Sequence, residues 1–407
     1  MHQLATLTGE RMVTLVRRTM VCNEITLSYL ERGALSAATP TLVFIHGYGR
    51  CAEDYGLVFP HIPESWHVIA LDLRGHGQSE RTGTGYEMQK LASDVESFFD
   101  AMGLSQAVLI GHSMGSLVAR LVAISRPDLV KSLVLAASTS SFANHPALKQ
   151  YEPVIAKLQD PIPEESMSRL VAGSLVNAPP PAFLEGVIQR CCSVPARIWR
   201  TSLSAMLAGG YSDQLDRLKV STLVIWGEED LFTRPEQDRL VSAVTDARLI
   251  SYENTGHDVP VERPEWLARD ILEFARGNFS VNERIMHEII DMWNGADPSR
   301  LAEIIDPGYI DNVPMPGPGH GPERIAAQIA AVRENNPECR YSIDELVSSG
   351  NHMILRYTYH ESRTQSMNTE GESTGIAWYQ LRNGRVIRRF LYSEAFYASK
   401  WIAQPGS

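Results

Sequence analysis

A serine between two glycines is the first part of the sequence with residue types and spacing suited to chemistry. The segment 111–115, GHSMG, directly follows the apolar run AVLI and directly precedes an amphipathic helical pattern. Where a strand turns sharply into a helix, glycines leave room for neighbouring elements and the serine hydroxyl is pushed into the open. The helix N-terminus also offers the Met114 backbone N–H to an oxyanion. The segment predicts that Ser113 is a nucleophile.

Such a serine needs a base and a group that orients the base, because its hydroxyl is a weak nucleophile at neutral pH. Asp230 follows the strand-like run LVIW, and His257 follows the strand-like run RLISY. We expect Asp230 to hold the imidazole tautomer that accepts the Ser113 proton and to stabilise the imidazolium that forms. Glu228 and Glu229 are interpreted as solvated neighbours of this aspartate. The sequence predicts a Ser113, Asp230 and His257 triad.

The loop after the apolar run TLVFI is expected to complete the oxyanion hole. Its sequence, 46–49, is HGYG, with glycines where backbone must approach a substrate oxygen closely. We assign the second N–H donor to Tyr48, beside the one from Met114, and expect Gly47 to line the substrate. A competing interpretation is a dinucleotide-binding G-x-G-x-x-A with Asp72 25 residues after Gly47. It leaves the triad without a role, so we disfavour it.

The elements that must position these residues are apolar strands and the amphipathic helices between them. Continuous Val-, Ile- and Leu-rich runs alternate with amphipathic helices, which is typical of a parallel sheet covered on both faces. These runs occupy residues 41–46, 67–73, 107–112, 131–138 and 221–227.

From about 141 to 217 the pattern is helical and broken by prolines, and we interpret this stretch as a helical cap. Trp199 and Met206 lie in it at helical spacing, where core packing and the lining of an acyl pocket are equally favoured. Together with Gly47 and with His112, interpreted as a structural histidine beside the nucleophile, they form the expected substrate-binding set.

A second unit begins near Val281 and alternates polar and apolar residues with period two. Such segments indicate antiparallel strands with one solvated face, and Asn383-Gly384 suggests a hairpin turn. We therefore divide the chain into a domain at 1–276 and an α+β domain at 281–407.

Five motifs together resemble the α/β-hydrolase family, of the esterase and C–C hydrolase type, over roughly residues 10 to 276. They are His46-Gly47, the segment 72–79, the turn around Ser113, the segment 227–230 and Gly256-His257. The resemblance implies an α/β fold with an eight-stranded, mostly parallel sheet, a helical cap, and activity on esters, lactones, thioesters or related acyl compounds. Members with an aspartate nucleophile are disfavoured because the turn carries Ser113.

The second domain resembles the SnoaL-like polyketide cyclases of the nuclear-transport-factor-like fold. The resemblance rests on segments 292–297, 304–309 and 321–323 and on the hairpin 383–387. It implies a cone-shaped α+β domain with an internal pocket, and its late-strand acid position holds Leu391, which argues against cyclase activity. The candidate polar residues of the pocket are His320, Tyr341, Arg356, Tyr392 and Glu394. We interpret the domain first as a dimerisation or ligand-holding module, and only second as a catalyst.

Composition and net charge indicate which classes of partner the protein can bind. A net charge of −11 and a pI near 5.6 disfavour nucleic-acid binding. Five irregularly spaced cysteines and the lack of a signal peptide or apolar span favour a soluble, cytoplasmic protein without membrane partners. We expect no metal and no cofactor, a small-molecule substrate, and a homodimer through the C-terminal domain.

The resulting hypothesis is a serine hydrolase that works through an acyl-enzyme, in natural-product (polyketide-like) metabolism. Two alternatives stay open. One is a cofactor-free cyclase or lyase, or a C–C bond hydrolase, acting on a polyketide-like substrate. The other is a non-catalytic ligand-binding protein.

Overall fold

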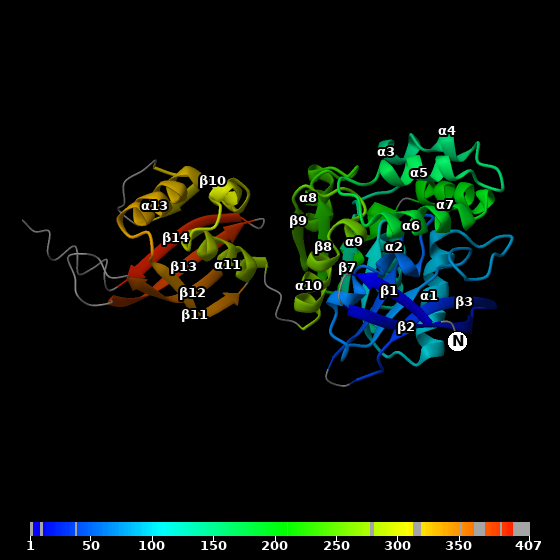
Figure 1. Ribbon diagram of the computed structural model, residues 1–407, viewed down its shortest axis with the longest axis horizontal. Coiled ribbons are helices and arrows are strands. Elements are labelled where there is room, and N and C mark those ends of the chain that lie inside the picture. The colour runs from blue at the N-terminus through cyan, green and yellow to red at the C-terminus, as the bar shows by residue number, and fades with distance from the viewer. Residues whose placement is uncertain are drawn as a thin grey trace, which may run out of the picture. The chain divides into compact units, whose positions relative to one another are not determined.

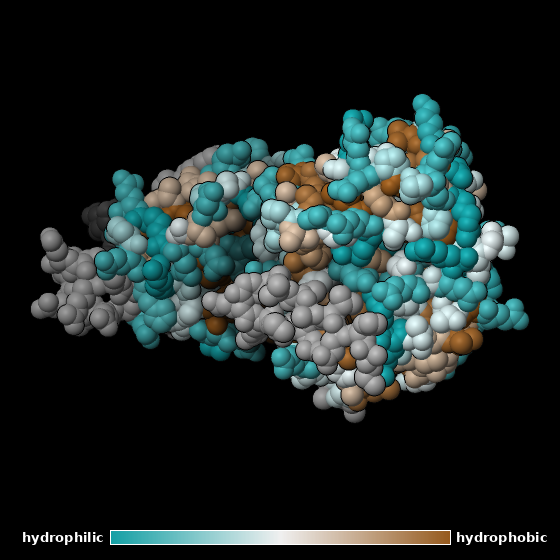
Figure 2. Space-filling view, turned by 45° about the vertical axis from the view of Figure 1, so that its right-hand side comes forward, coloured by the Kyte–Doolittle hydropathy of each residue, from teal (hydrophilic) through white to brown (hydrophobic). Residues whose placement is uncertain are grey.

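The computed structural model describes residues 3–8, 11–36, 39–209, 211–276, 281–311, 319–349, 352–361, 371–382 and 385–393. The chain divides into two compact units, Met1–Phe279 and Ser280–Ser407 (Figure 1). In the described part of the chain, no helix is long and apolar enough to span a membrane. On the face shown in Figure 2, hydrophilic residues are spread over the surface and smaller hydrophobic areas are interspersed among them.

A single sheet runs through the first unit, and its described strands number nine, in the order β1-β2-β3-β5-β4-β6-β7-β8-β9. Neighbours from β5 to β9 pair in parallel, and the pairs β1·β2, β2·β3 and β3·β5 are antiparallel. The strands are β1 Gln3–Thr8, β2 Arg11–Cys22, β3 Ile25–Arg32, β4 Thr41–Ile45, β5 Val68–Leu71, β6 Ala107–His112, β7 Val130–Ala136, β8 Thr222–Gly227 and β9 Ala247–Tyr252.

The mostly parallel sheet that the resemblance implies is therefore confirmed. Strands β4 and β6 are buried along their whole length, as expected where helices cover both faces of a parallel sheet. The resemblance implied eight strands, whereas here β1 adds a further edge strand. It pairs with the long β2, whose extra length leaves edge hydrogen-bonding groups for it to satisfy.

Helices flank this sheet, and a further group of helices is inserted in the chain between β7 and β8. The flanking helices are α1 Met88–Met102, α2 Met114–Ser125, α8 Arg234–Ala243, α9 Val259–Glu262 and α10 Pro264–Ala275, with short 3₁₀ turns at Ala52–Tyr55, Phe59–His61 and Pro127–Leu129. The inserted group consists of α3 Pro146–Lys149, α4 Glu152–Ile155, α5 Glu164–Ala172, α6 Pro181–Ser193, α7 Ala196–Ala208 and the 3₁₀ turn Tyr211–Arg217. Figure 1 shows α3 to α7 gathered at the top of the unit, and we refer to them as the cap.

The second unit is an α+β domain with a five-stranded sheet in the order β10-β14-β13-β12-β11. Its elements are α11 Val281–Trp293, the turn Pro298–Arg300, α12 Leu301–Ile304, β10 Ile305–Asp311, α13 Pro322–Asn335, β11 Arg340–Ser349, β12 His352–Glu361, β13 Gly371–Arg382 and β14 Arg385–Ser393. The last four strands pair antiparallel, as the period-two pattern predicts, while β10 pairs in parallel with β14. The predicted turn Asn383-Gly384 lies outside the described residues, between the paired Arg382 and Arg385.

Candidate active site

Ser113 lies on a strained turn between β6 and α2. Its backbone has φ 51° and ψ −118°, a conformation that residues other than glycine rarely adopt. A Cβ on Gly111 would overlap the carbonyl oxygen of Gly115, and one on Gly115 would overlap that of Ile45. The two glycines are therefore needed because the strand, the helix and β4 approach each other here without room for side chains.

The side chains of Ser113, His257 and Asp230 form a continuous hydrogen-bonded chain. Nδ1 of His257 lies 2.7 Å from Oδ1 of Asp230, and Nε2 of His257 lies 2.9 Å from Oγ of Ser113. A carboxylate can only accept, so Nδ1 carries the imidazole proton and Nε2 is left to accept the serine proton. The Asp230 side chain is fully buried and that of His257 is 12% exposed. The arrangement can deprotonate the serine as it attacks.

The charge balance around His257 favours its protonated form. Burial of the imidazole lowers its pKa, but the charge of Asp230, the hydrogen bond to it and the charge of Asp258 together outweigh burial, so the pKa of His257 lies above its usual range. This shift suits a group that takes a proton during the reaction, because the imidazolium is stabilised where it forms.

The loop 46–49 packs directly on the nucleophile turn. A Cβ on Gly47 would lie 2.9 Å from Nδ1 of His112 and 3.3 Å from Cβ of Ser113, so the backbone of this loop runs against the serine. Met114 is the first residue of α2, next to the serine. The structure therefore brings the loop that carries Tyr48 and the first residue of α2 together at Ser113, as the predicted pair of donors requires.

Two of the other predicted substrate residues contact these loops. The Trp199 ring packs edge-to-face on Tyr48 with centroids 4.6 Å apart, and the Tyr48 hydroxyl donates to the Trp199 carbonyl oxygen. His112 donates from Nε2 to the carbonyl oxygen of His257 at 2.9 Å, and burial, with the nearby His257, lowers its pKa to about 4. Met206 is instead buried within the apolar core that joins the cap to the sheet.

Sequence inspection missed a buried charge network next to the triad. Arg50 forms an ion pair with Asp258, the residue after His257, and also lies 3.6 Å from Asp54. The rings of Phe232 and His257 pack in a T-shaped arrangement with centroids 5.4 Å apart. The adjacency of Asp258 to His257 was the one available signal, but no pattern links it to Arg50, 208 positions earlier.

The competing interpretations of this region are not supported by the contacts. Asp72, the acid of the alternative dinucleotide motif, accepts from Arg17 and from two backbone N–H groups, so it serves the fold.

A cluster of three potential metal ligands lies in the same region. Ligand atoms of Cys51, Glu53 and Asp72 lie within 4.8 Å of one another, as in metal sites. The guanidinium of Arg17 pairs with both carboxylates and already supplies the cation there.

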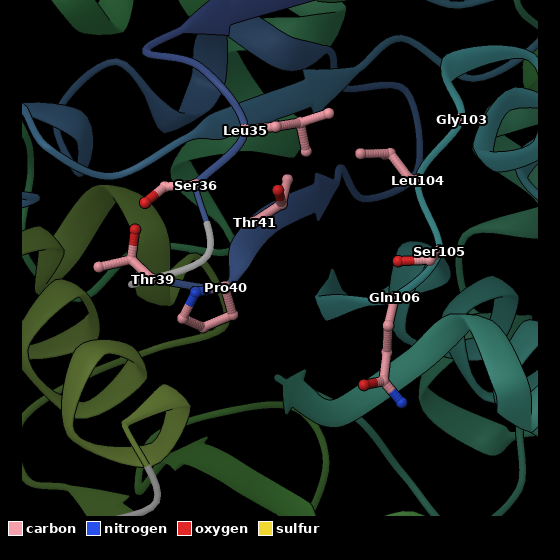
Figure 3. A pocket seen from close by; sticks show the side chains of 9 residues that line it. All are labelled: Leu35, Ser36, Thr39, Pro40, Thr41, Gly103, Leu104, Ser105 and Gln106. Carbon is pink, nitrogen blue, oxygen red and sulfur yellow. The ribbon is translucent and has the colours of Figure 1, made fainter.

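A cavity of about 320 Å³ lies at the amino ends of the central strands β4 and β6 (Figure 3). Its lining includes Thr41 at the start of β4 and Gln106 just before β6, whereas Ser113 follows the end of β6. In open α/β sheets ligands bind at the carboxyl ends of the strands, so this cavity has no place in the chemistry of the triad.

In the second unit, the candidate pocket residues are scattered. Tyr341 packs against Trp293 and two other tyrosines. His320 is exposed, and Arg356 and Tyr392 are about half exposed. The predicted residue Glu394 lies outside the described residues.

A polar cluster inside the same unit was not foreseen. Arg389, 3% exposed, donates to Asp311 at 3.0 Å and to Gln328 at 2.7 Å, and Arg324 donates to the same aspartate. The alternation of β14 could have indicated that Arg389 faces inward. Alternate residues of a strand share a face, and Leu391, two positions later, packs against the core.

Comparison with known proteins matches each of the two units to a known family. The alpha/beta hydrolase family model matches residues 42–270, and the SnoaL-like domain model matches residues 286–389. The chain is 29% identical over 255 residues to the uncharacterized hydrolase YugF of Bacillus subtilis, covering 58% of this chain and 90% of that protein. It is 26% identical over 262 residues to a pimeloyl-(acyl-carrier protein) methyl ester esterase of Neisseria meningitidis, covering 61% of this chain and 98% of the esterase.

Solved structures agree on the fold of the first unit. A putative lipase from Acinetobacter baumannii superposes with a TM-score of 0.58 at 25% identity, covering 65% of this chain and 93% of the lipase. The enol-lactonase from Burkholderia xenovorans superposes with a TM-score of 0.57 at 19% identity, covering 64% and 100%, which supports the fold alone. Because the family model covers more than half of the chain, this chain belongs to the alpha/beta hydrolase family, and a SnoaL-like domain follows its hydrolase unit.

Proposed function

We propose that this chain is a serine hydrolase that cleaves a small-molecule carboxylic ester, lactone or thioester through an acyl-enzyme. The observation that carries the proposal is the hydrogen-bonded chain from Asp230 through His257 to Ser113 Oγ, at 2.7 and 2.9 Å. A hydroxyl held at this distance from a neutral imidazole nitrogen is an activated nucleophile.

In the proposed reaction, Ser113 Oγ attacks the substrate carbonyl while Nε2 of His257 takes its proton. The backbone N–H groups of Tyr48 and Met114 stabilise the oxyanion of the tetrahedral intermediate. His257 then donates the proton to the leaving group, and a water that it deprotonates hydrolyses the acyl-enzyme. Asp230 stays ionised and stabilises the imidazolium in both halves of the reaction.

The substrate class rests on relatives and on the cap. The methyl ester esterase from Neisseria meningitidis and the putative lipase from Acinetobacter baumannii have names that denote ester cleavage. The serine beneath the cap is only 7% exposed, so a small acyl compound suits the site better than a polymer. The SnoaL-like domain, which resembles polyketide cyclases, motivates a substrate from natural-product metabolism.

The proposal is tested with p-nitrophenyl esters of increasing acyl length and a fluorophosphonate probe. Wild type should turn over the shorter esters and gain the mass of one phosphonyl group as the probe loses fluoride, while Ser113→Ala should lose about 10⁴-fold or more in rate and gain no such group. Ser125→Ala is the matched control, because Ser125 lies at the far end of the same helix. Equal rates for wild type and Ser113→Ala would end the proposal.

The second candidate keeps the fold but changes the reaction, to cyclisation or lyase chemistry or C–C bond hydrolysis on a polyketide-like substrate. The fused SnoaL-like domain is the observation that favours it. Product mass separates hydrolysis, which adds one water, from cyclisation and lyase chemistry, which add none. Because C–C bond hydrolysis also adds one water, the identity of the products separates it from ester cleavage: an ester releases an alcohol with the acid, whereas C–C bond hydrolysis releases a fragment with a new C–H bond. A protein that binds acyl ligands but neither turns them over nor reacts with the probe would be a ligand-binding protein.

We also propose a homodimer through the second domain. The outer face of its sheet carries Val347, Ile354, Ile376 and Tyr392, each about half exposed, on four neighbouring strands. Such a row suits a symmetric contact with a second copy. Sedimentation should give a dimer that Ile354→Lys converts to a monomer, and a monomeric wild type at micromolar concentration would contradict the proposal.

We also propose a cytoplasmic location. All five cysteines are free, which agrees with a reducing compartment.

A further inference from the structure

A buried ion pair joins the oxyanion loop to the loop that carries the catalytic histidine. Arg50 directly follows the loop 46–49, and its backbone N–H donates to the Gly47 carbonyl oxygen at 3.2 Å. Asp258 directly follows His257, and the Arg50 guanidinium binds its Oδ2. The two side chains are 9% and 4% exposed. The pair therefore links two loops that must keep a fixed separation around the substrate carbonyl.

The cap is attached to the same pair through the segment 174–177, which connects α5 to α6 and which we name the cap strap. Ser174 Oγ donates to Asp258 Oδ2 at 2.6 Å, and the backbone N–H of His257 donates to the Ser174 carbonyl oxygen at 3.0 Å. Glu262, in α9, accepts from two consecutive backbone N–H groups of the strap at 3.0 and 2.9 Å. The strap is therefore bound both to the histidine loop and to the helix that follows it.

A second attachment reaches the cap from the other end of the pair. Arg50 lies 3.6 Å from Asp54, and Asp54 accepts from Arg190 of α6 at 2.8 Å. Positive and negative groups thus alternate from Asp258 through Arg50 and Asp54 to Arg190. The row is neutral as a whole, which is what allows charged groups to be buried beside the triad.

Buried ion pairs contribute little net stability compared with apolar packing, and in some proteins their role is to specify a geometry. We propose that the Arg50–Asp258 pair is a positioning pair, which sets the oxyanion loop against the catalytic imidazole and couples that geometry to docking of the cap strap. This inference rests on the proposed function and names residues that act on it through Tyr48 and His257. Neither Arg50 nor Asp258 touches the reacting atoms in this role.

The electrostatics of His257 provide a readout that a purely structural role would not move. The charged and titratable groups that face its imidazole are Asp230, Asp258, Arg50 and His112. Burial lowers the pKa of His257, Asp230 and Asp258 raise it, and Arg50 lowers it. Removing the charge of Asp258 should therefore shift the acidic limb of kcat/KM to lower pH, and removing that of Arg50 should shift the limb to higher pH.

The experiment compares Asp258→Asn, Arg50→Gln and the double variant in full-length protein with a p-nitrophenyl ester. Each single variant should lose about 100-fold in kcat with little change in KM, since small misplacement of catalytic groups costs this much. The double variant should be no slower than the slower single one, because both residues serve one contact. Asp94→Asn is the matched control: Asp94 is also buried and pairs with an arginine, Arg74, and neither residue belongs to the oxyanion loop or to the loop that carries His257.

The outcomes separate the inference from the proposed function. If Ser113→Ala is inactive while Asp258→Asn retains wild-type kcat and an unshifted acidic limb, the positioning role is wrong and the hydrolase proposal stands. If Ser113→Ala retains activity, the hydrolase proposal itself fails. Should Asp258→Asn not fold, the double variant leaves no unpaired charge at this position. Ser174→Ala removes the side-chain link between Asp258 and the cap strap, together with the hydroxyl's contact to the Val171 carbonyl oxygen. Wild-type kcat in both of these would overturn the inference.

Discussion

Nε2 of His257 lies 2.9 Å from Oγ of Ser113, although the two residues are 144 positions apart in the chain. The contact exists because β6, which ends at the serine turn, and β8 and β9, which precede Asp230 and His257, run parallel in one sheet. Their carboxyl ends therefore open on the same edge, where loops from each strand can meet.

Replacing the triad acid by its amide should abolish most of the activity while leaving the fold intact. In Asp230→Asn the amide can donate to Nδ1 of His257, which favours the tautomer with the proton on Nε2, facing the serine. We expect kcat to fall by about 10⁴-fold. Steady-state rates, with circular dichroism as the control for folding, test this. Glu229→Gln, one position away, should keep near wild-type rates, and a comparable loss there would contradict the assignment of the acid.

The pH dependence of kcat/KM should have an acidic limb set by His257. The imidazole works as a base only when it is neutral, and its pKa is raised. Activity should therefore fall to half its plateau at a pH above the usual histidine value of about 6.5. Protonated His257 stabilises the folded state, so this stability contribution is present at low pH and is lost as pH rises through the same pKa. A limb below pH 6 would contradict the charge balance described above.

Three other buried histidines should make the protein sensitive to acid. Burial lowers the pKa of His46 and His112 to about 4 and that of His76 to about 3. The unfolded chain binds protons at these positions below about pH 6.5, while the folded protein does not, so stability is lost as pH falls toward 4. Each group contributes up to about 1.4 kcal/mol per pH unit. Urea unfolding at pH 7.5, 6 and 5 measures this loss, and His76→Gln should make it less steep.

The contact between the oxyanion loop and the cap should tolerate no side chain at Gly49. Its φ is 69°, and a Cβ there would overlap the Trp199 ring. Gly49→Ala should lower the free energy of unfolding by about 2 kcal/mol or more, from the clash together with the backbone strain. In a Trp199→Leu background the same change should cost less. Gly83→Ala is the control, because nothing lies within 4 Å of a Cβ at that position; an equal loss there would contradict the explanation.

The sequence alone was enough to propose which residues do the chemistry and to predict what kind of sheet holds them. The glycines around Ser113 and the order of Ser113, Asp230 and His257 are local patterns whose physical reasons, room for backbone and a base with its orienting acid, do not depend on distant contacts. Uninterrupted apolar runs such as 107–110 likewise indicate buried parallel strands. The alternation in 371–393 indicates antiparallel ones by the same kind of local argument.

Only the tertiary structure decided which buried charges meet. The pairs Arg50–Asp258 and Arg389–Asp311 join positions 208 and 78 residues apart. Neither has a local pattern, because an ion pair needs proximity in space and any of the many charged residues of the chain could have been the partner. The contact of Trp199 with Tyr48 likewise depends on how the cap docks. Local patterns specify elements and reactive groups, whereas the packing of those elements selects the neighbours that tune them.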